Sequence, residues 1–225
     1  MSKRRLRRWI ARSLLVVTGW KPEGSRPDSH HCVLIAAPHT SNWDFAYLLI
    51  FAAYFDLKVN WMGKHSLFRP PFGRVMKALG GIPIVRELRE NVVSAMVHSL
   101  REHPQLILVV PAEGTRSRRD YWRSGFYHIA LEADVPIVMS YLDYTQKRGG
   151  FGPAFHPSGD VRKDMDRVRA FYAGKEGKHP ERFGPIRLCE EDSHASPLGS
   201  NSIPASGQPD ARTPNRSGTE IHENR

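Results

Sequence analysis

The sequence predicts an α/β fold: a single domain with a mixed, largely parallel sheet flanked by helices. Three short runs, residues 32–37, 106–110 and 135–139, are wholly apolar, as strands buried on both faces are. Stretches with helical periodicity lie between these runs, and Pro or Gly residues interrupt the chain at their ends. Short apolar strands that alternate with helices are typical of a sheet covered by helices on both faces.

The individual elements follow in order along the chain. Strands are predicted at residues 32–37, 58–62, 82–85, 106–110 and 135–139. Helices are predicted at residues 43–55, 72–79, 87–102 and 124–132, where apolar residues recur at helical spacing. Pro38 and Pro111 stop two of the strands, and Gly80 and Gly81 separate a helix from the strand that follows it.

Length and composition fit one domain with its own core. The chain has 225 residues, of which 40% are hydrophobic, so no disulfide or metal is needed to hold the core. Two cysteines, Cys32 and Cys189, exclude a disulfide scaffold and supply no zinc ligand set. The longest apolar stretch, residues 45–55, is too short for a transmembrane helix, which needs about 20 residues. We therefore expect a cytoplasmic globular protein, soluble or bound to a surface.

The C-terminal end has a different composition from the rest. Residues 193–225 contain no aromatic residue and only isolated Leu and Ile. Such a segment cannot bury enough apolar surface to offset the entropy that it would lose on ordering. We predict a disordered tail over residues 193–225, a folded domain over residues 30–185 and an N-terminal helix over residues 1–22.

The net charge of +10 is concentrated in the N-terminal segment. Residues 1–21 hold seven basic residues and no acidic one, whereas the other 204 residues carry a net charge of only +3. Apolar residues recur near helical spacing in the same segment: Leu6, Trp9, Ile10, Leu14 and Val17. A basic amphipathic helix suits an anionic membrane surface, where each Lys or Arg contributes about 1 kcal/mol. A plain surface helix packed on the core and a nucleic-acid contact are the alternatives, and no small-residue cleavage site supports a secretory signal.

The strongest local motif follows the first buried strand and reads Pro-His-Thr-Ser-Asn-Trp-Asp over residues 38–44. Open α/β sheets place their ligands in loops at the carboxyl ends of strands. A turn in which Ser41 or Asn42 caps the next helix would fold His39 back over Asp44. The carboxylate would then fix the imidazole tautomer and leave the other ring nitrogen to take a proton. The spacing alone leaves open that His39 is a loop histidine and that Asp44 caps the helix or forms a salt bridge.

Two further segments carry arginines after predicted strands. Residues 111–118 read Pro-Ala-Glu-Gly-Thr-Arg-Ser-Arg, and a glycine beside hydroxyl and guanidinium groups suits binding of an anion such as phosphate. A solvated turn explains the same segment. Residues 81–86 deliver Arg86 from a strand to a loop, where a surface salt bridge is the simpler explanation.

Together, these segments resemble the glycerophospholipid acyltransferase family, whose members include lysophosphatidic acid acyltransferases. That family carries four ordered blocks, and all four have counterparts in order here. They are His-x4-Asp at residues 39–44, Gly-Ile-Pro-Ile-Val-Arg at 81–86, Glu-Gly-Thr-Arg-Ser at 113–117 and Val-Pro-Ile-Val at 135–138. The resemblance covers roughly residues 35–140 and implies the same α/β fold.

The resemblance implies a role for each matched residue. His39 would be the general base on the acceptor hydroxyl, and Asp44 would orient it. Residues that would bind the acceptor or its phosphate are Arg86, Glu113, Gly114, Thr115 and Arg116. The implied reaction moves an acyl chain from acyl-CoA or acyl carrier protein to the free hydroxyl of a lysophosphatidate-like acceptor in phospholipid synthesis, without a covalent acyl-enzyme. The absence of a Gly-x-Ser-x-Gly nucleophile motif agrees with direct transfer.

Other functions remain open at this point. The same chemistry could act on a glycolipid or an amino lipid, or the chain could be a non-catalytic basic module that binds a membrane surface. A metal site built from His30, His31, His39 and Asp44 lacks known ligand spacing, and no cofactor is expected beyond the acyl donor as co-substrate. The expected partners are an anionic membrane surface, a lysophospholipid acceptor and the acyl donor, but not nucleic acid. We expect a peripheral protein on the cytoplasmic face of the cell membrane.

Overall fold

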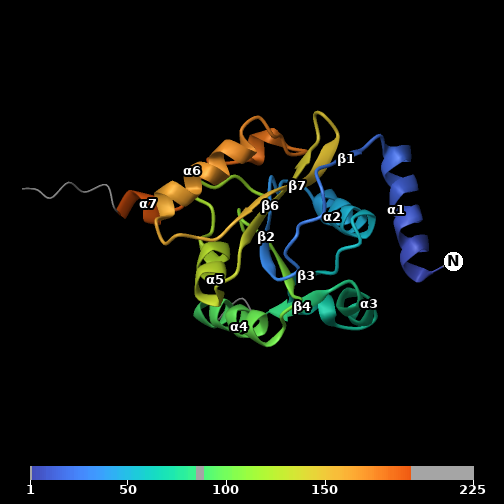
Figure 1. Cartoon of the computed structure of the whole chain (residues 1–225), viewed down its shortest axis with the longest axis horizontal. Coiled ribbons are helices and arrows are strands. Elements are labelled where there is room, and N and C mark those ends of the chain that lie inside the picture. The colour runs from blue at the N-terminus through green and yellow to red at the C-terminus, as the bar shows by residue number, and fades with distance from the viewer. Residues whose placement is uncertain (1, 85–88, 194–225) are drawn as a thin grey trace, which may run out of the picture. The chain divides into compact units, whose positions relative to one another are not determined.

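Seven strands form one mixed sheet in the structure, a computed structural model that describes residues 2–84 and 89–193. Helices cover both faces of this sheet (Figure 1), so the predicted fold class is confirmed. Arg86 and residues 194–225, which make up nearly all of the predicted tail, lie outside the described residues.

The strand order in the sheet is β1-β7-β6-β2-β5-β3-β4. The strands are β1 (Lys21–Glu23), β2 (Cys32–Ala36), β3 (Val59–Lys64), β4 (Gly81–Ile84), β5 (Ile107–Pro111), β6 (Ile137–Asp143) and β7 (Arg148–Phe155). Neighbouring strands run parallel except for β6 and β7, which are antiparallel. The sheet is therefore largely parallel, and its long connections leave room for helices.

The helices form two layers, one on each face of the sheet (Figure 1). One layer consists of α4 (Arg89–Glu102), α5 (Gly125–Ala133) and α6 (Val161–Tyr172). The other consists of α2 (Trp43–Tyr54), the 3-10 helix η1 (His65–Phe68) and α3 (Gly73–Ala78), with α1 (Lys3–Thr18) packed on α2. Two short elements complete the described chain, η2 (Pro180–Arg182) and α7 (Glu190–Ser193).

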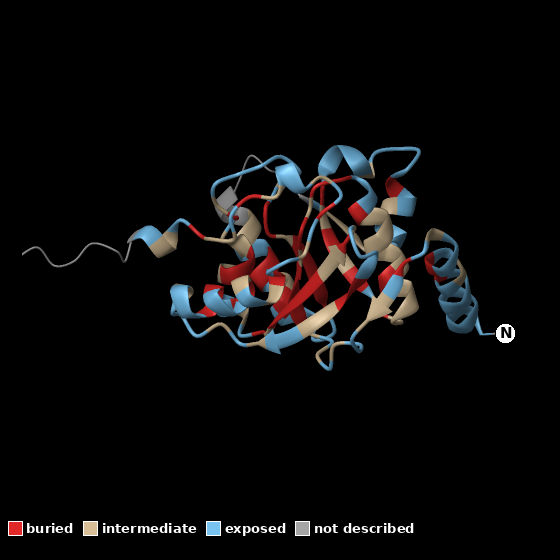
Figure 2. Cartoon of the chain, turned by 90° about the horizontal axis from the view of Figure 1, so that it is seen from above, coloured by how far each residue is buried: buried red, intermediate tan, exposed pale blue. Residues whose placement is uncertain are grey.

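The central strand β2 supplies side chains to both layers. Val33 and Ile35 pack in the cluster with α4, α5 and α6, whereas Cys32 and Leu34 pack in the cluster with α2. Successive residues of a strand point to opposite faces, so an uninterrupted apolar run is what a doubly covered strand requires. Figure 2 shows these buried strands in red between helices whose outer surfaces are exposed.

The helix α1 contacts the domain along one narrow stripe. Ala11 and Leu15 are buried, whereas Trp9, Val16 and Val17 are 63%, 70% and 84% exposed. The apolar residues of this helix therefore fall into a packed set and an unpacked set. No helix in residues 2–84 or 89–193 combines the length and the apolar character needed to cross a membrane.

The pairing of β2 with β5 brings two of the motif segments to the same edge of the sheet. Ala36 at the end of β2 lies opposite Pro111 at the end of β5, and the two strands are parallel. The loops that follow, residues 38–42 and 112–118, consequently leave the sheet side by side. By contrast, the Val-Pro-Ile-Val block leads into β6, where Val135, Ile137 and Val138 are buried in the core.

Candidate active site

The His-x4-Asp segment folds back on itself at the carboxyl end of β2. The Nδ1 atom of His39 lies 3.2 Å from Oδ2 of Asp44, which stands in the first turn of α2. The backbone N–H groups of Thr40 and Ser41 each donate to the same Asp44 oxygen at 2.8 Å. The expected turn is present, but Asp44 holds it; Ser41 accepts only from the N–H of Trp43, at 3.2 Å.

Asp44 is buried, and both of its carboxylate oxygens accept hydrogen bonds. Its second oxygen, Oδ1, accepts a hydrogen bond of 2.7 Å from the hydroxyl of Tyr144, a residue in the turn between β6 and β7. Burial acts to raise the pKa of Asp44, but hydrogen bonds from His39, Tyr144 and Ser41 outweigh burial and hold the pKa below its ordinary value. The carboxyl is therefore an anion aimed at the imidazole of His39.

Tyr144 is a site residue that sequence reasoning missed. Burial and the neighbouring Asp44 raise its pKa, so its hydroxyl remains a hydrogen-bond donor. Its ring packs edge-on against Trp20, with centroids 4.9 Å apart, and Trp20 also contacts Tyr47 of α2. This aromatic cluster fixes the wall of the site next to Asp44. No local motif surrounds Tyr144, so only the folded chain could reveal it.

Glu113 lies behind the His39 loop rather than in the cavity. Its Oε1 accepts the backbone N–H of His39 at 2.6 Å, while Oε2 is buried without a hydrogen-bond partner in the described part of the chain. Burial raises the pKa of Glu113 to about 8; the hydrogen bond from His39 opposes this and the charge of Asp44 adds to it. Near neutral pH, this carboxyl is therefore largely protonated and links the loop after β5 to the loop after β2.

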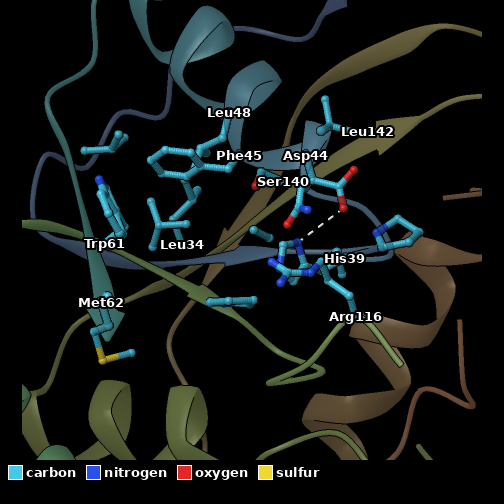
Figure 3. A pocket seen from close by; sticks show the side chains of 18 of the residues that line it. Leu34, His39, Asp44, Phe45, Leu48, Trp61, Met62, Arg116, Ser140 and Leu142 are labelled. Carbon is cyan, nitrogen blue, oxygen red and sulfur yellow. Dashed lines mark ion pairs between the residues drawn. The ribbon is translucent and has the colours of Figure 1, made fainter. Parts of the chain in front are cut away.

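A cavity of about 740 Å³ opens beside the His39–Asp44 pair. It lies between the sheet and the α2 layer, and its polar end is formed by His39, Asp44, Arg116 and Ser140 (Figure 3). Apolar side chains from the strands and from α2 line the rest: Leu34, Phe45, Leu48, Phe51, Trp61, Val109 and Phe151. The cavity therefore combines a short polar end with a longer apolar part.

The structure brings most of the predicted site residues together. Gly114, Thr115 and Arg116 line the polar end of the cavity. Gly114 has a φ of +66°, and a Cβ at this position would lie 2.6 Å from Cγ of Arg123, so glycine suits this turn. Arg86 lies outside the described residues.

A second, smaller hollow of about 280 Å³ lies on the other side of the His39 loop. It is lined by residues 40–43, by Arg116 and by three residues late in the chain, Lys178, His179 and Arg182. The N–H of His179 donates to the hydroxyl of Thr40 at 3.1 Å, which ties the late segment to the loop. These late residues lie outside all four sequence blocks, and no local motif marks them.

The two histidines just before β2, His30 and His31, make contacts away from Asp44. His31 Nε2 lies 2.8 Å from the carbonyl oxygen of Leu100, and the ring of His30 contacts Arg26. Within residues 2–84 and 89–193, no group of three or more His, Cys, Asp or Glu side chains is arranged to hold a metal ion.

The fold and the site together define an α/β protein with a histidine–carboxylate pair at the polar end of a mostly apolar cavity. This arrangement suits removal of a proton from a group that is attached to, or reacts with, an apolar chain. The sequence profile of the Acyltransferase family matches residues 21–142, more than half of the chain. The chain belongs to this family and is an acyltransferase.

One solved structure shares the fold over most of both chains. The crystal structure of the 1-acyl-sn-glycerophosphate (LPA) acyltransferase PlsC from Thermotoga maritima matches with a TM-score of 0.52 and 17% sequence identity, over 77% of this chain and 81% of that chain. At this identity the match supports the fold alone. The comparison with curated protein sequences returned no match.

Proposed function

We propose that this acyltransferase moves an acyl chain from acyl-CoA or acyl carrier protein to the free hydroxyl of a lysophosphatidate-like acceptor. The observation that carries the proposal is the 3.2 Å contact between His39 Nδ1 and Asp44 Oδ2 at the polar end of the cavity. A histidine held in this way has its second ring nitrogen, Nε2, available to take a proton.

His39 acts as general base in the proposed reaction. Nε2 removes the proton of the acceptor hydroxyl while the oxygen attacks the thioester carbonyl carbon of the donor. The new C–O bond forms, the C–S bond breaks, and the leaving thiolate takes the proton back from the imidazolium. Asp44 remains an anion throughout and stabilises the positive imidazole. No acyl-enzyme is formed, so the protein emerges unchanged.

Each part of the cavity has a role in this proposal. The apolar side chains around Trp61 and Phe45 accommodate an acyl chain. Contact between these surfaces is favourable because it removes apolar area from water. The guanidinium of Arg116 and the loop that contains Gly114 and Thr115 bind the phosphate of the acceptor. Arg86 joins them in this proposal on the strength of its sequence block alone.

Two observations support this acceptor class. The solved structure with the same fold is named an LPA acyltransferase, and the polar end of the cavity offers a cation for a phosphate. The exposed apolar side chains of α1, together with six basic residues before Ser13, suit residence on an anionic membrane surface at the cytoplasmic face.

The test is a transfer assay with purified protein. Labelled acyl-CoA and acyl carrier protein are each offered with lysophosphatidate, other lysophospholipids, a glycolipid and an amino lipid, and the product is identified by mass. We expect acylated lysophosphatidate from the wild type and none above background from His39→Ala. Transfer only to a glycolipid or an amino lipid would reject the acceptor while leaving the chemistry intact, and hydrolysis without transfer would reject the proposed reaction.

A further inference from the structure

The exposed apolar side chains of this protein gather on one side of the sheet. The described residues include twelve large apolar side chains that are exposed, and eleven belong to the α2 layer. Six of them lie on α1, one at the start of α2 and four between Leu67 and Leu79. The twelfth, Leu131 of α5, lies in the opposite layer. Isolated exposed apolar residues are ordinary, but a one-sided distribution indicates a contact surface.

Residues 64–79, named here the 64–79 surface, contain η1 and α3 and have two different sides. Phe68 and Met76 point inward and pack against the apolar cluster below α2. Leu67, Phe72 and Val75 point outward and are 48%, 66% and 51% exposed. The inward side chains hold the segment on the domain, so the outward ones are available without unfolding.

The charged residues of this segment are all basic. The 64–79 surface contains Lys64, Arg69, Arg74 and Lys77 and no acidic residue, and all four cations are exposed. None of the four forms an ion pair with a carboxylate in the described part of the chain. Apolar tips interspersed with unpaired cations match the interface of an anionic bilayer, in which acyl chains lie below phosphate groups.

We propose that the 64–79 surface is a second membrane-contact surface, which lies on an anionic phospholipid bilayer together with α1. A second copy of the chain fits this surface less well, because two such copies would bring four cations against four cations. A bilayer supplies both anionic headgroups for the cations and an apolar interior for the exposed apolar side chains. The basic N-terminal helix alone would leave the domain free to rotate, whereas two contacts in the same layer set its orientation.

The position of the cavity gives this orientation a consequence. Ser66 and Leu67 of the 64–79 surface, together with Met76, form part of the cavity wall. A bilayer against this surface therefore lies next to the cavity, and a lipid substrate would pass from the bilayer into it without crossing water. This last step rests on the proposed function, whereas the contact itself does not.

The first test uses two exposed positions that do not line the cavity. We expect the double variant Phe72→Glu/Val75→Glu to bind vesicles of phosphatidylcholine with phosphatidylglycerol at least about tenfold more weakly than the wild type. The control is Leu131→Glu, which places a single glutamate at a side chain 40% exposed in the opposite layer and should bind as the wild type does. Flotation with vesicles measures binding without turnover, so a failed transfer assay cannot be mistaken for failed binding.

The second test uses the wild-type protein and does not depend on how a variant folds. Hydrogen–deuterium exchange with and without the same vesicles should show protection of amides in residues 64–79 and in α1, but not in α5. Protection confined to α1, or wild-type vesicle binding by the double variant, would overturn the proposal. So would a double variant that turns a dimer into a monomer without vesicles while it still binds them, because the surface would then be an interface between copies.

Discussion

The two helical layers of this acyltransferase differ in how they treat their apolar side chains. In the layer of α4, α5 and α6, the inner residues of α6, namely Met165, Val168 and Tyr172, are completely buried, and little apolar surface remains outside. In the other layer, α1 buries only Ala11 and Leu15 and leaves most of its apolar side chains exposed. The cavity and the His39–Asp44 pair adjoin this second layer. One layer thus completes the core, while the other borders the cavity and presents an apolar outer surface.

The largest effect is expected at His39 and Asp44, the proposed catalytic pair. His39→Ala should lower kcat by about 10²–10⁴, because a general base contributes a factor of this size. Asp44→Asn should also be severe, since a neutral amide cannot stabilise the imidazolium. The exposed His30 provides a control, and His30→Ala should retain wild-type turnover. A folded His39→Ala variant with near-normal turnover would show that His39 is not the general base.

The second prediction separates the packed and unpacked sets of α1. Leu15→Ala should lower the free energy of unfolding by about 2–5 kcal/mol, because Leu15 is buried against α2 and Trp20. The double variant Trp9→Glu/Val17→Glu should leave the melting temperature nearly unchanged but weaken binding to anionic vesicles. Thermal melts and flotation on the same samples check both. If the exposed pair lowered stability as much as Leu15→Ala, α1 would be part of the core and not a membrane contact.

The third prediction concerns the pH dependence of stability that Glu113 introduces. As the pH rises from the ordinary pKa of 4.5 to the folded-state value of about 8, the unfolded chain releases the Glu113 proton while the folded chain keeps it. The folded state binds more protons in this window, so Glu113 makes stability fall as the pH rises. Glu113→Gln keeps an acceptor for the His39 N–H and cannot ionise; its stability relative to the wild type should therefore increase between pH 5 and pH 8.

Activity distinguishes the positioning role of Glu113 from direct acceptor binding. Glu113→Gln should retain most turnover at neutral pH, whereas Glu113→Ala should lower kcat because the His39 loop loses its link. Acceptor KM should change little in both variants. A large rise in acceptor KM with unchanged kcat would assign Glu113 to the acceptor instead.

A smaller effect than at His39 is expected at Tyr144. Tyr144→Phe removes the hydrogen bond to Asp44 Oδ1, and one bond to a charged group corresponds to about a tenfold change in kcat. Without this donor the pKa of Asp44 should rise, so the loss of turnover that follows protonation of Asp44 at acid pH should begin at a higher pH. An unchanged profile with unchanged kcat would show that the aromatic cluster only supports the wall.

The buried parallel strands could be predicted from the sequence because they are covered on both faces. The runs at residues 32–37 and 106–110 correspond to β2 and β5, and the helices predicted at 43–55 and 124–132 correspond to α2 and α5. In each case, local apolar pattern and burial agree. The close approach of His39 and Asp44 could also be predicted, since it depends on a turn within six residues.

The elements that were not predicted depend on contacts distant in sequence. No strand was predicted over Arg148–Phe155, because this segment contains three glycines and a proline instead of an apolar run. The glycines are required by the neighbouring chain: a Cβ at Gly150 would collide with the backbone oxygen of Glu23 in β1. The helical spacing of Met165, Val168 and Tyr172, all buried, is the sequence signal that marks α6.

In the site, too, local contacts could be predicted and contacts distant in sequence could not. Tyr144 is 100 residues from Asp44, and nothing near it in the sequence marks it as a partner. The resemblance to the family associated Glu113 with acceptor binding, but its burial behind His39 depends on β2 lying beside β5. Residues 178–182 reach the site only because the late segment bonds to Thr40.

Hydrogen bonds from the backbone N–H groups of residues 39–41 hold the loop that carries His39. Asp44 bonds to the N–H groups of residues 40 and 41, and Glu113 bonds to the N–H of residue 39. The imidazole can therefore be removed without loosening the loop, and His39→Ala should keep the shape of the cavity while losing turnover. We expect such a variant to retain a bound lipid when it is purified from cells. Extraction and mass spectrometry would identify this lipid.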